Sequence, residues 1–177
     1  MFEIKPWDGD TYRRQTRRST LIIAVVFLAL AMLLSSLAVL LLGTPGGDNF
    51  RFNLGGVIVA VLAMAVLMRQ YFWLQPWMAA AVYGWQLKRS LMKITNVMHQ
   101  VTAGVQAQDP TAMKLLRFYH LGLAQMHQLD ANSSAQGSLA READAHLANM
   151  QALGLDSEQA RLDPSWIEAL KQAYRAG

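Results

Sequence analysis

The stretch STLIIAVVFLALAMLLSSLAVLLL, residues Ser19–Leu42, decides the fold of this chain. Its 24 residues carry no charge, and at about 1.5 Å per residue a helix of that length exceeds the roughly 30 Å hydrocarbon thickness of a bilayer. A secretory signal peptide is the competing interpretation, because Arg17 and Arg18 directly precede the run. The apolar run is too long for a signal-peptide core. We therefore expect transmembrane helix 1 over residues 19–42.

A turn follows this span and is itself followed by a second apolar run. The sequence TPGGDN, Thr44–Asn49, cannot continue a helix, because proline fixes φ and glycine permits positive φ. We expect a periplasmic turn over residues 43–53 and transmembrane helix 2 over residues 54–75. Arg69, Trp73 and Trp77 are predicted interface anchors, since an arginine near the end of a span can reach the headgroups and tryptophans gather there.

Small residues recur at helical spacing on both predicted spans. Lipid gives no hydrophobic drive for helix association, so close backbone approach has to hold such a pair together. The predicted packing positions are Ala31, Ser35 and Ala38 on the first span and Gly56, Ala60 and Ala63 on the second. Because the connecting turn is short, the sequence predicts an antiparallel transmembrane hairpin.

Composition and charge distribution place the remainder of the chain. The 177 residues are 53% hydrophobic and 16% charged, contain no cysteine, and carry a formal net charge of +4. Basic residues precede the first span in a basic segment over residues 1–18, and Lys88, Arg89 and Lys93 follow the second. The positive-inside rule predicts that both termini are cytoplasmic, as expected for a multi-pass membrane protein with two spans. Nucleic acid is not expected as a partner, because base-stacking aromatics do not alternate with these arginines.

An apolar seam with heptad spacing follows Pro76. Steps of three and four residues predict one interfacial and heptad helix over residues 76–108. The predicted helix-interaction seam comprises Leu87, Leu91, Ile94, Met98, Val101 and Val105. Such a seam indicates a coiled-coil-like contact with another helix.

The region over residues 109–177 is predicted to be a cytoplasmic antiparallel helical bundle. Asp109-Pro110 and Asp163-Pro164 each combine a good N-cap with a proline suited to the first helical position. Between them, a helix is expected from about Ser138 to Leu153 with Gly154 as its C-cap. The predicted fold class is an all-α membrane protein, a transmembrane hairpin followed by this bundle.

The histidines are the only groups that titrate naturally near neutrality. His120 and His127 lie two turns apart on one helix face, and Glu142 lies one turn before His146. A helical di-metal site would need Glu-x-x-His pairs and a zincin would need His-Glu-x-x-His, and neither pattern occurs in the sequence. No P-loop, Gly-x-Gly-x-x-Gly or Gly-x-Ser-x-Gly motif occurs either. We therefore expect no metal, no cofactor and no catalytic residues.

Three stretches of the chain together resemble a known family: NFRFNLGGV at 49–57, VYGWQLK at 82–88, and LRFYHLGL at 116–123 continuing to QLD at 128–130. They are similar to domain-of-unknown-function family 3087, small two-span inner-membrane proteins of gammaproteobacteria. The resemblance covers nearly the whole chain and implies an inner-membrane location without an established activity. Tyrosine is common in the family at the places of His120 and His127, which weakens a shared metal role there.

These patterns lead to one functional hypothesis and one alternative. The hypothesis is a non-enzymatic inner-membrane accessory or scaffold protein, whose cytoplasmic helices bind a second copy or another membrane or cytoplasmic helical protein. The alternative is an oligomeric transport or channel component, in which hairpins line a pathway with Ser35, Ser36 and Gln70 as its few polar groups. The lipid bilayer is the expected partner in both.

Overall fold

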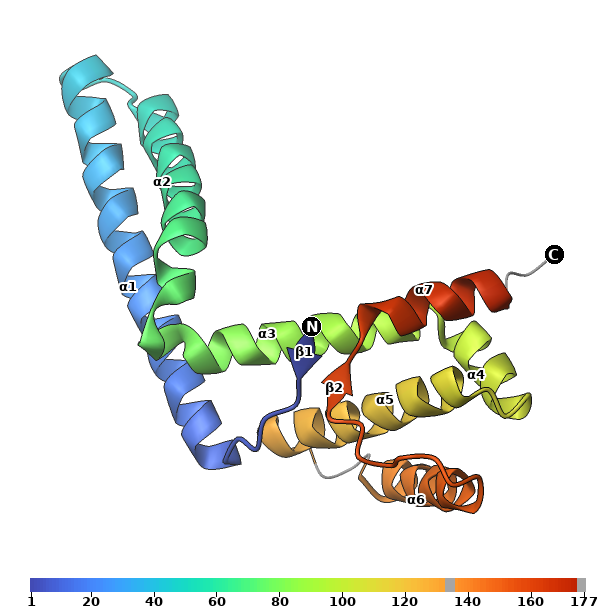
Figure 1. Ribbon diagram of the computed structural model, residues 1–177. Helices are drawn as coiled ribbons and strands as arrows, with labels where there is room; N and C mark the ends of the chain where they lie inside the picture. The colour runs from blue at the N-terminus through green and yellow to red at the C-terminus, as the bar shows by residue number, and fades with distance from the viewer. Residues whose placement is uncertain (133–135, 175–177) are drawn as a thin grey trace. The chain divides into compact units, whose positions relative to one another are not determined.

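The computed structural model describes residues 1–132 and 136–174 (Figure 1). Within these ranges the chain is all-α apart from one pair of two-residue strands. It divides into two units, which we call the hairpin unit, Arg14–Val82, and the helical unit, Met1–Arg13 together with the chain from Tyr83 onward. Residues 133–135 and 175–177 of the expected region 109–177 lie outside the described residues.

The elements follow one another in a simple order. They are β1 (Phe2–Glu3), α1 (Gly9–Leu42), α2 (Phe50–Gln70), the 3-10 turns η1 (Phe72–Leu74) and η2 (Pro76–Met78), α3 (Ala79–Thr95), α4 (Met98–Gln106), α5 (Pro110–Leu129), α6 (Gln136–Ala152), β2 (Arg161–Leu162) and α7 (Pro164–Ala173). The prediction of an all-helical chain is confirmed, and the β1–β2 pair is an element that the sequence did not indicate.

Within the hairpin unit, the apolar parts of α1 and α2 pack against each other, so the predicted pairing of these two helices as a hairpin is confirmed. The helices approach closely at Gly56, where an added Cβ would overlap the backbone of Ser35 on α1. Ala60 and Met64 continue the buried face of α2 one and two turns further on. Ser35 also donates a hydrogen bond from its hydroxyl to the Asn53 side-chain oxygen, at 2.8 Å. Small size at Gly56 and Ala60 is therefore what lets the two helices touch.

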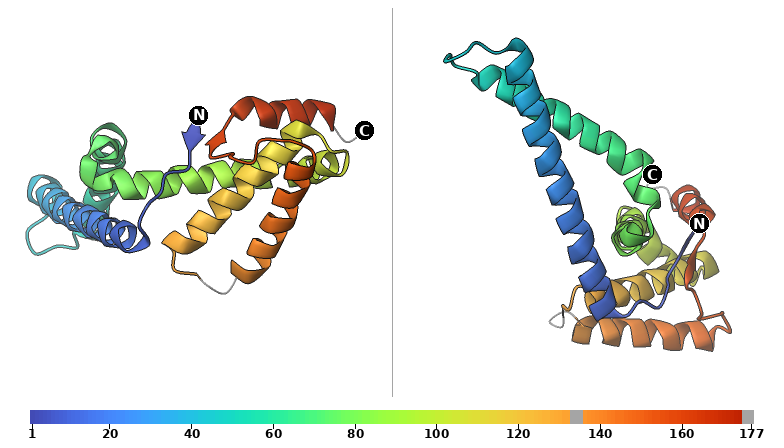
Figure 2. Two further views of the ribbon diagram at one scale, coloured as in Figure 1. Left: turned by 60° about the horizontal axis from the view of Figure 1, so that its bottom comes forward. Right: turned by 90° about the vertical axis from the view of Figure 1, so that its left-hand side faces the viewer.

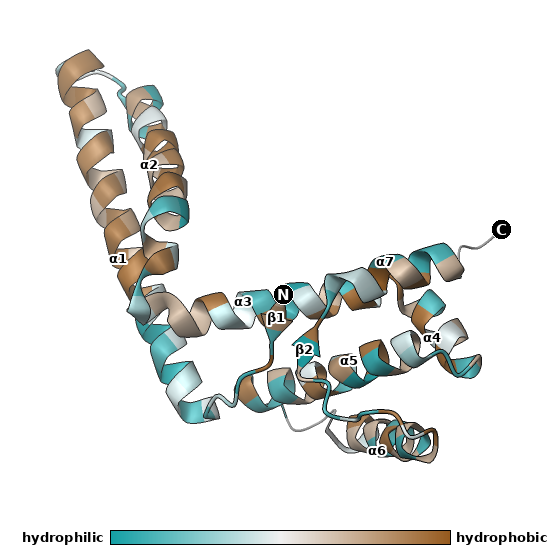
Figure 3. Ribbon diagram, in the orientation of Figure 1, coloured by the Kyte–Doolittle hydropathy of each residue, from teal (hydrophilic) through white to brown (hydrophobic). Residues whose placement is uncertain are grey.

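The outer faces of the hairpin are apolar and exposed. Figure 3 shows hydrophobic residues along most of α1 and α2. Leu33 is 64% exposed, Leu40 80% and Ile58 53%. Both helices are long and apolar enough to cross a membrane, judged by length and composition. The most apolar window of α1 has no buried residue, unlike the core helix of a soluble protein, which would be mostly buried.

A buried serine of α1 contacts the segment that follows α2 in the hairpin unit. Ser19 is 1% exposed, and its hydroxyl lies 2.8 Å from the carbonyl oxygen of Gln15 and 2.6 Å from that of Trp77. The contact with Trp77 satisfies a backbone carbonyl in η2, where the chain leaves regular helical hydrogen bonding. The exit from α2 toward α3 is thus tied to α1.

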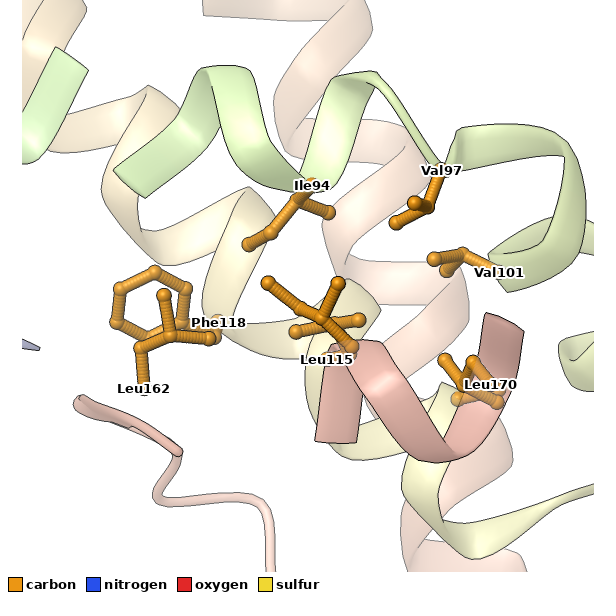
Figure 4. Close-up of a cluster of buried hydrophobic side chains, with 9 residues drawn as sticks. Ile94, Val97, Val101, Leu115, Phe118, Leu162 and Leu170 are labelled. Atoms are coloured by element: carbon orange, nitrogen blue, oxygen red, sulfur yellow. The ribbon is translucent and has the colours of Figure 1, made fainter. Parts of the chain in front are cut away.

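The helical unit is built around two apolar clusters. The first is labelled in part in Figure 4 and comprises Ile94, Val97, Val101, Ala112, Leu115, Phe118, Leu162, Ile167 and Leu170. The second comprises Tyr83, Leu87, Leu91 and Leu129. Gly122 of α5 lets α3 approach closely, since an added Cβ would lie 2.9 Å from Leu91 Cδ2. α5 is therefore central, contacting α4, α6 and α7 as well.

The structure divides the helix expected over residues 76–108. α3 ends at Thr95, and α4 begins at Met98 after a turn at Asn96 and Val97. Val97 has φ −120° and ψ 18°, and its N–H bonds to the carbonyl oxygen of Ile94 rather than one residue earlier. The Thr95 hydroxyl bonds back to the Leu91 carbonyl, a contact that bends helices. The prediction of one continuous helix was wrong at this point, because threonine, asparagine and valine are all weak helix formers.

The first residues of the chain belong to the helical unit. β1 pairs antiparallel with β2, with Phe2 opposite Leu162. The Phe2 ring packs edge-on against Phe118, with 6.4 Å between centroids. Further on, the Lys5 backbone N–H donates to the Tyr83 hydroxyl at 3.0 Å, and the Gln125 side-chain amide donates to the Lys5 carbonyl. The N-terminal segment is therefore part of the core rather than a separate tail.

Helix ends in the helical unit follow the sequence signals. Asp109 caps α5 by accepting from the backbone N–H of Thr111 at 2.7 Å, and Asp163 caps α7 by accepting from Ser165 at 2.9 Å. Gly154 adopts φ +66° after α6, the left-handed conformation of a C-cap. The predicted start of α5 and α7 and the predicted end of α6 are confirmed.

Adjacent glycines on α2 give a matched test of the hairpin. We expect Gly56→Val to lower the stability of the hairpin by about 1–3 kcal/mol, because the new side chain overlaps α1. Gly55→Val makes the same chemical change where nothing lies within 4 Å of an added Cβ, and should be nearly neutral. The measurement is thermal unfolding of both variants in detergent. Equal melting temperatures for the two variants would contradict the observed packing.

Candidate functional site

The predicted helix-interaction seam is packed within the chain itself. Leu87 and Leu91 lie in the second cluster, and Ile94 and Val101 lie in the first, all at most 5% exposed. Met98 and Val105 are half-buried and pack against the first cluster. Their partners are residues of α5, α7 and β2. The seam is thus occupied by helices of the same chain.

The other residues singled out in the sequence lie in the hairpin unit. Gly56 and Ala60 are buried, whereas Ala31, Ser35, Ala38 and Ala63 are half-buried. Arg69 is exposed in the last turn of α2. Trp73 lies in η1 and Trp77 in η2, both half-buried, and the Trp77 ring packs against Phe72 with 5.3 Å between centroids. These aromatics gather where α2 ends.

A groove of about 560 Å³ in the helical unit combines polar and apolar side chains. It lies over α4, α5 and α6, and Figure 2 shows α5 and α6 side by side. The lining residues are Met98, Thr102, Leu116, Tyr119, His120, Glu142, Ala145, His146 and Asn149. It brings together His120 and His146, which are distant in sequence.

The two histidines form a buried contact between α5 and α6. His120 is 6% exposed and His146 5%, and their rings meet edge-to-face with 5.5 Å between centroids. Nε2 of His146 lies 2.9 Å from the Met113 carbonyl oxygen, and since a carbonyl only accepts, this nitrogen carries the proton. Nδ1 of His120 is buried without a hydrogen-bond partner among the described residues. One imidazole is thus fixed in its tautomer, and the other is incompletely satisfied.

Both histidines are held in their neutral form. Burial lowers the pKa of His120 to about 4, with further lowering by His146 and by the Arg117 guanidinium. Burial also lowers the pKa of His146, against the effect of its bond to Met113, and Arg117 lowers it further. Glu142 lies on the exposed edge of the groove. A base with a pKa near 4 accepts protons poorly at pH 7. The histidine pair is therefore better suited to packing α5 against α6 than to proton transfer.

A metal ion at these two histidines would need further ligands from the chain. Among residues 1–132 and 136–174, no three or more His, Cys, Asp or Glu side chains come together in a way that could hold an ion. His127 and His99 lie apart from the groove lining. The pair alone supplies two imidazoles, fewer than the three protein ligands usual in catalytic zinc sites.

The sequence contained one overlooked signal for this contact. In α6, Leu139, His146 and Met150 are buried, with spacing typical of one helix face. Leu147, the next residue along the helix, is only half-buried. A histidine at an apolar position of an amphipathic helix was therefore the available indication. Its proximity to His120 depends on the packing of α5 against α6, which the sequence did not reveal.

The fold and groove define an all-α protein with an exposed apolar hairpin and a separate helical unit closed by its own N-terminus. The chain belongs to the family described as "Protein of unknown function (DUF3087)", whose model matches residues 2–167. The family assigned from the sequence is thus confirmed. Neither a curated protein nor a solved structure matches the chain.

Acid should weaken the helical unit through His120. Its folded-state pKa lies below the ordinary value of about 6.5. Between pH 6.5 and about 4 the unfolded chain therefore binds more protons at His120 than the folded chain does. The contribution of neutral His120 to the free energy of unfolding is full above pH 6.5 and is lost as the pH falls through this window. The free energy of unfolding of the parent protein should fall between pH 7 and pH 4. We expect this fall to be smaller by roughly 2–3 kcal/mol in His120→Gln.

The measurement is urea unfolding of both proteins at a series of pH values, followed by helical circular dichroism. His99→Gln is the matched control, because it makes the same chemical change at an exposed histidine. Parallel pH profiles for the parent and His120→Gln would contradict the assigned role of burial.

Proposed function

We propose that the protein is a non-enzymatic accessory or scaffold protein of the bacterial inner membrane. In this proposal the hairpin unit spans the bilayer twice, and the helical unit stands on the cytoplasmic side and binds itself or another helical protein. The observation that carries the proposal is that two segments distant in sequence form the helical unit. These are residues 1–13 and the chain from Tyr83 onward. Pairing of β1 with β2 requires both ends of the chain on one side of any membrane.

The exposed surface of the hairpin supports the membrane part of the proposal. Large contiguous apolar surfaces are rare on soluble monomers. Leu33, Leu40 and Ile58 are each more than half exposed. In lipid these residues are solvated by acyl chains, and the backbone polar groups of both helices remain satisfied internally. Basic residues on both flanks of the hairpin favour the cytoplasmic side for the helical unit.

The N-terminal segment also bears on the signal-peptide interpretation. Phe2 and Ile4 pack against the first cluster, and Lys5 bonds to Tyr83 and Gln125. Cleavage within α1 would remove these residues and expose the core of the helical unit. A retained N-terminus accords better with this packing than a cleaved one.

The polar groups of the hairpin favour an anchor over a transport pathway. Ser35 is half-buried and hydrogen-bonded to Asn53 between the helices. Gln70 lies at the end of α2 and is exposed. A polar side chain whose hydrogen bond is made within one hairpin is poorly placed to line a solute pathway between several hairpins. The transport alternative loses further support if reconstituted protein moves no solute across liposomes.

Reporter fusions test the topology. We expect reporters at residue 1 and after residue 177 both to be active in the cytoplasm. A reporter inserted at Gly46, in the exposed turn, should be active in the periplasm. The physical reason for this topology is that basic residues flank the hairpin on both sides and are retained on the cytoplasmic face of the membrane. A periplasmic signal from either end would overturn the two-span arrangement.

Crosslinking in native membranes tests the scaffold role. A photo-reactive residue at Ala145, on the exposed edge of the groove, should give a discrete product containing a second copy or one partner protein. The same residue at Leu33, on the apolar face of α1, is the control for random encounters within the bilayer. A protein that is strictly monomeric in detergent and gives no product from Ala145 would refute the scaffold role.

A further inference from the structure

The outer face of α3 carries a second apolar and basic surface, opposite the seam. Trp85 is 47% exposed and Met92 62%. Lys88, Arg89 and Lys93 are exposed as well. We call these five residues the outer α3 face. At about 100° per residue, Met92 and Arg89 lie within roughly 40° of Trp85, and Lys88 and Lys93 flank them on either side.

The charge of this face is of one sign. α3 contains three cations and no aspartate or glutamate. The ion pairs found among the described residues, Asp10–Arg13, Glu3–Arg161 and Glu168–Lys171, involve none of the three. Asp130 is the acidic residue that shares a small hollow with Lys88 and Trp85. A surface with this balance is complementary to anions.

The chemistry of the face narrows the class of anion. The Arg89 guanidinium lies 4.9 Å from the centroid of the Trp85 ring, so a cation and an indole are held side by side. Tryptophan and methionine favour an apolar boundary, and the flanking lysines can extend to headgroups while their stems cover apolar surface. A free phosphate would use the cations alone and leave Trp85 and Met92 in water. A bilayer surface uses both kinds of group.

The position of α3 in the chain strengthens this assignment. α2 ends at Gln70, and the aromatic residues of η1 and η2 lead directly to Ala79 at the start of α3. Trp85 and Met92 are about 9 and 20 Å along the helix from Ala79. If the hairpin is in the membrane, tethering gives lipid headgroups a high effective concentration at this face.

We propose that the outer α3 face binds the bilayer surface through anionic lipid headgroups, with Trp85 and Met92 at the acyl boundary. This inference rests on the proposed membrane anchoring of the hairpin. It adds a second contact between the protein and its membrane, and this contact depends on the anionic lipid content of the bilayer. Each cation near an anionic surface shifts the ratio of bound to free α3 by about fivefold.

The absence of cysteine allows a direct test with full-length protein. A fluorophore on Met92→Cys is followed in nanodiscs of phosphatidylcholine alone and of phosphatidylcholine with phosphatidylglycerol, each with a lipid-borne quencher. We expect strong quenching only with the anionic lipid, and its loss in 1 M salt, where the screening length is about 3 Å. Replacing Lys88, Arg89 and Lys93 together with Gln should abolish the dependence on anionic lipid.

Two control labels separate the possible failures. A label on Leu33→Cys should be quenched in both lipid mixtures, because it reports on the hairpin alone; if it is not, the membrane anchoring fails. A label on Ala169→Cys, on the exposed side of α7, should remain in water throughout. If Leu33→Cys behaves as expected and Met92→Cys remains aqueous in both mixtures, the lipid contact is refuted. Protection of Met92→Cys from water in lipid-free detergent would refute it in favour of a protein partner.

Discussion

Burial of one apolar stripe, from Leu87 to Val101, holds the helical unit together. The stripe crosses the break between α3 and α4 and meets α5, α7 and β2 in two clusters. Each large side chain in it stabilises the fold by removing apolar area from water, by about 1.5–3 kcal/mol for a fully buried leucine or isoleucine. The stripe is filled internally, whereas Trp85 and Met92 on the opposite face of α3 are exposed.

The hairpin unit and the helical unit are stabilised by different physics. In the helical unit, large side chains such as Phe118 fill space between helices. In the hairpin unit, Gly56 and Ala60 make contact by being small, and large side chains such as Leu33 and Ile58 point outward. This inversion is the arrangement expected where the surroundings are as apolar as the side chains. A single sequence thus contains two opposite packing patterns, separated at about Val82.

The sequence predicted much of the fold because its signals were local. The apolar runs, the turn at Pro45 and the caps at Asp109, Gly154 and Asp163 depend on neighbouring residues only. The break at Asn96 was missed because the heptad spacing continues through it. The β1–β2 pair and the contact of His120 with His146 could not be predicted, since two-residue strands have almost no pattern and both contacts join distant parts of the chain.

Closure of the helical unit on the first residues also constrains the order in which the parts of the protein fold. β1 lies at residues 2–3 and β2 at residues 161–162, so Phe2 cannot pair until Leu162 has been synthesised. At the usual 5–20 residues per second this interval is roughly 10–30 s. α1 and α2 leave the ribosome within it. The hairpin is therefore synthesised well before the last strand of the unit that encloses the N-terminus.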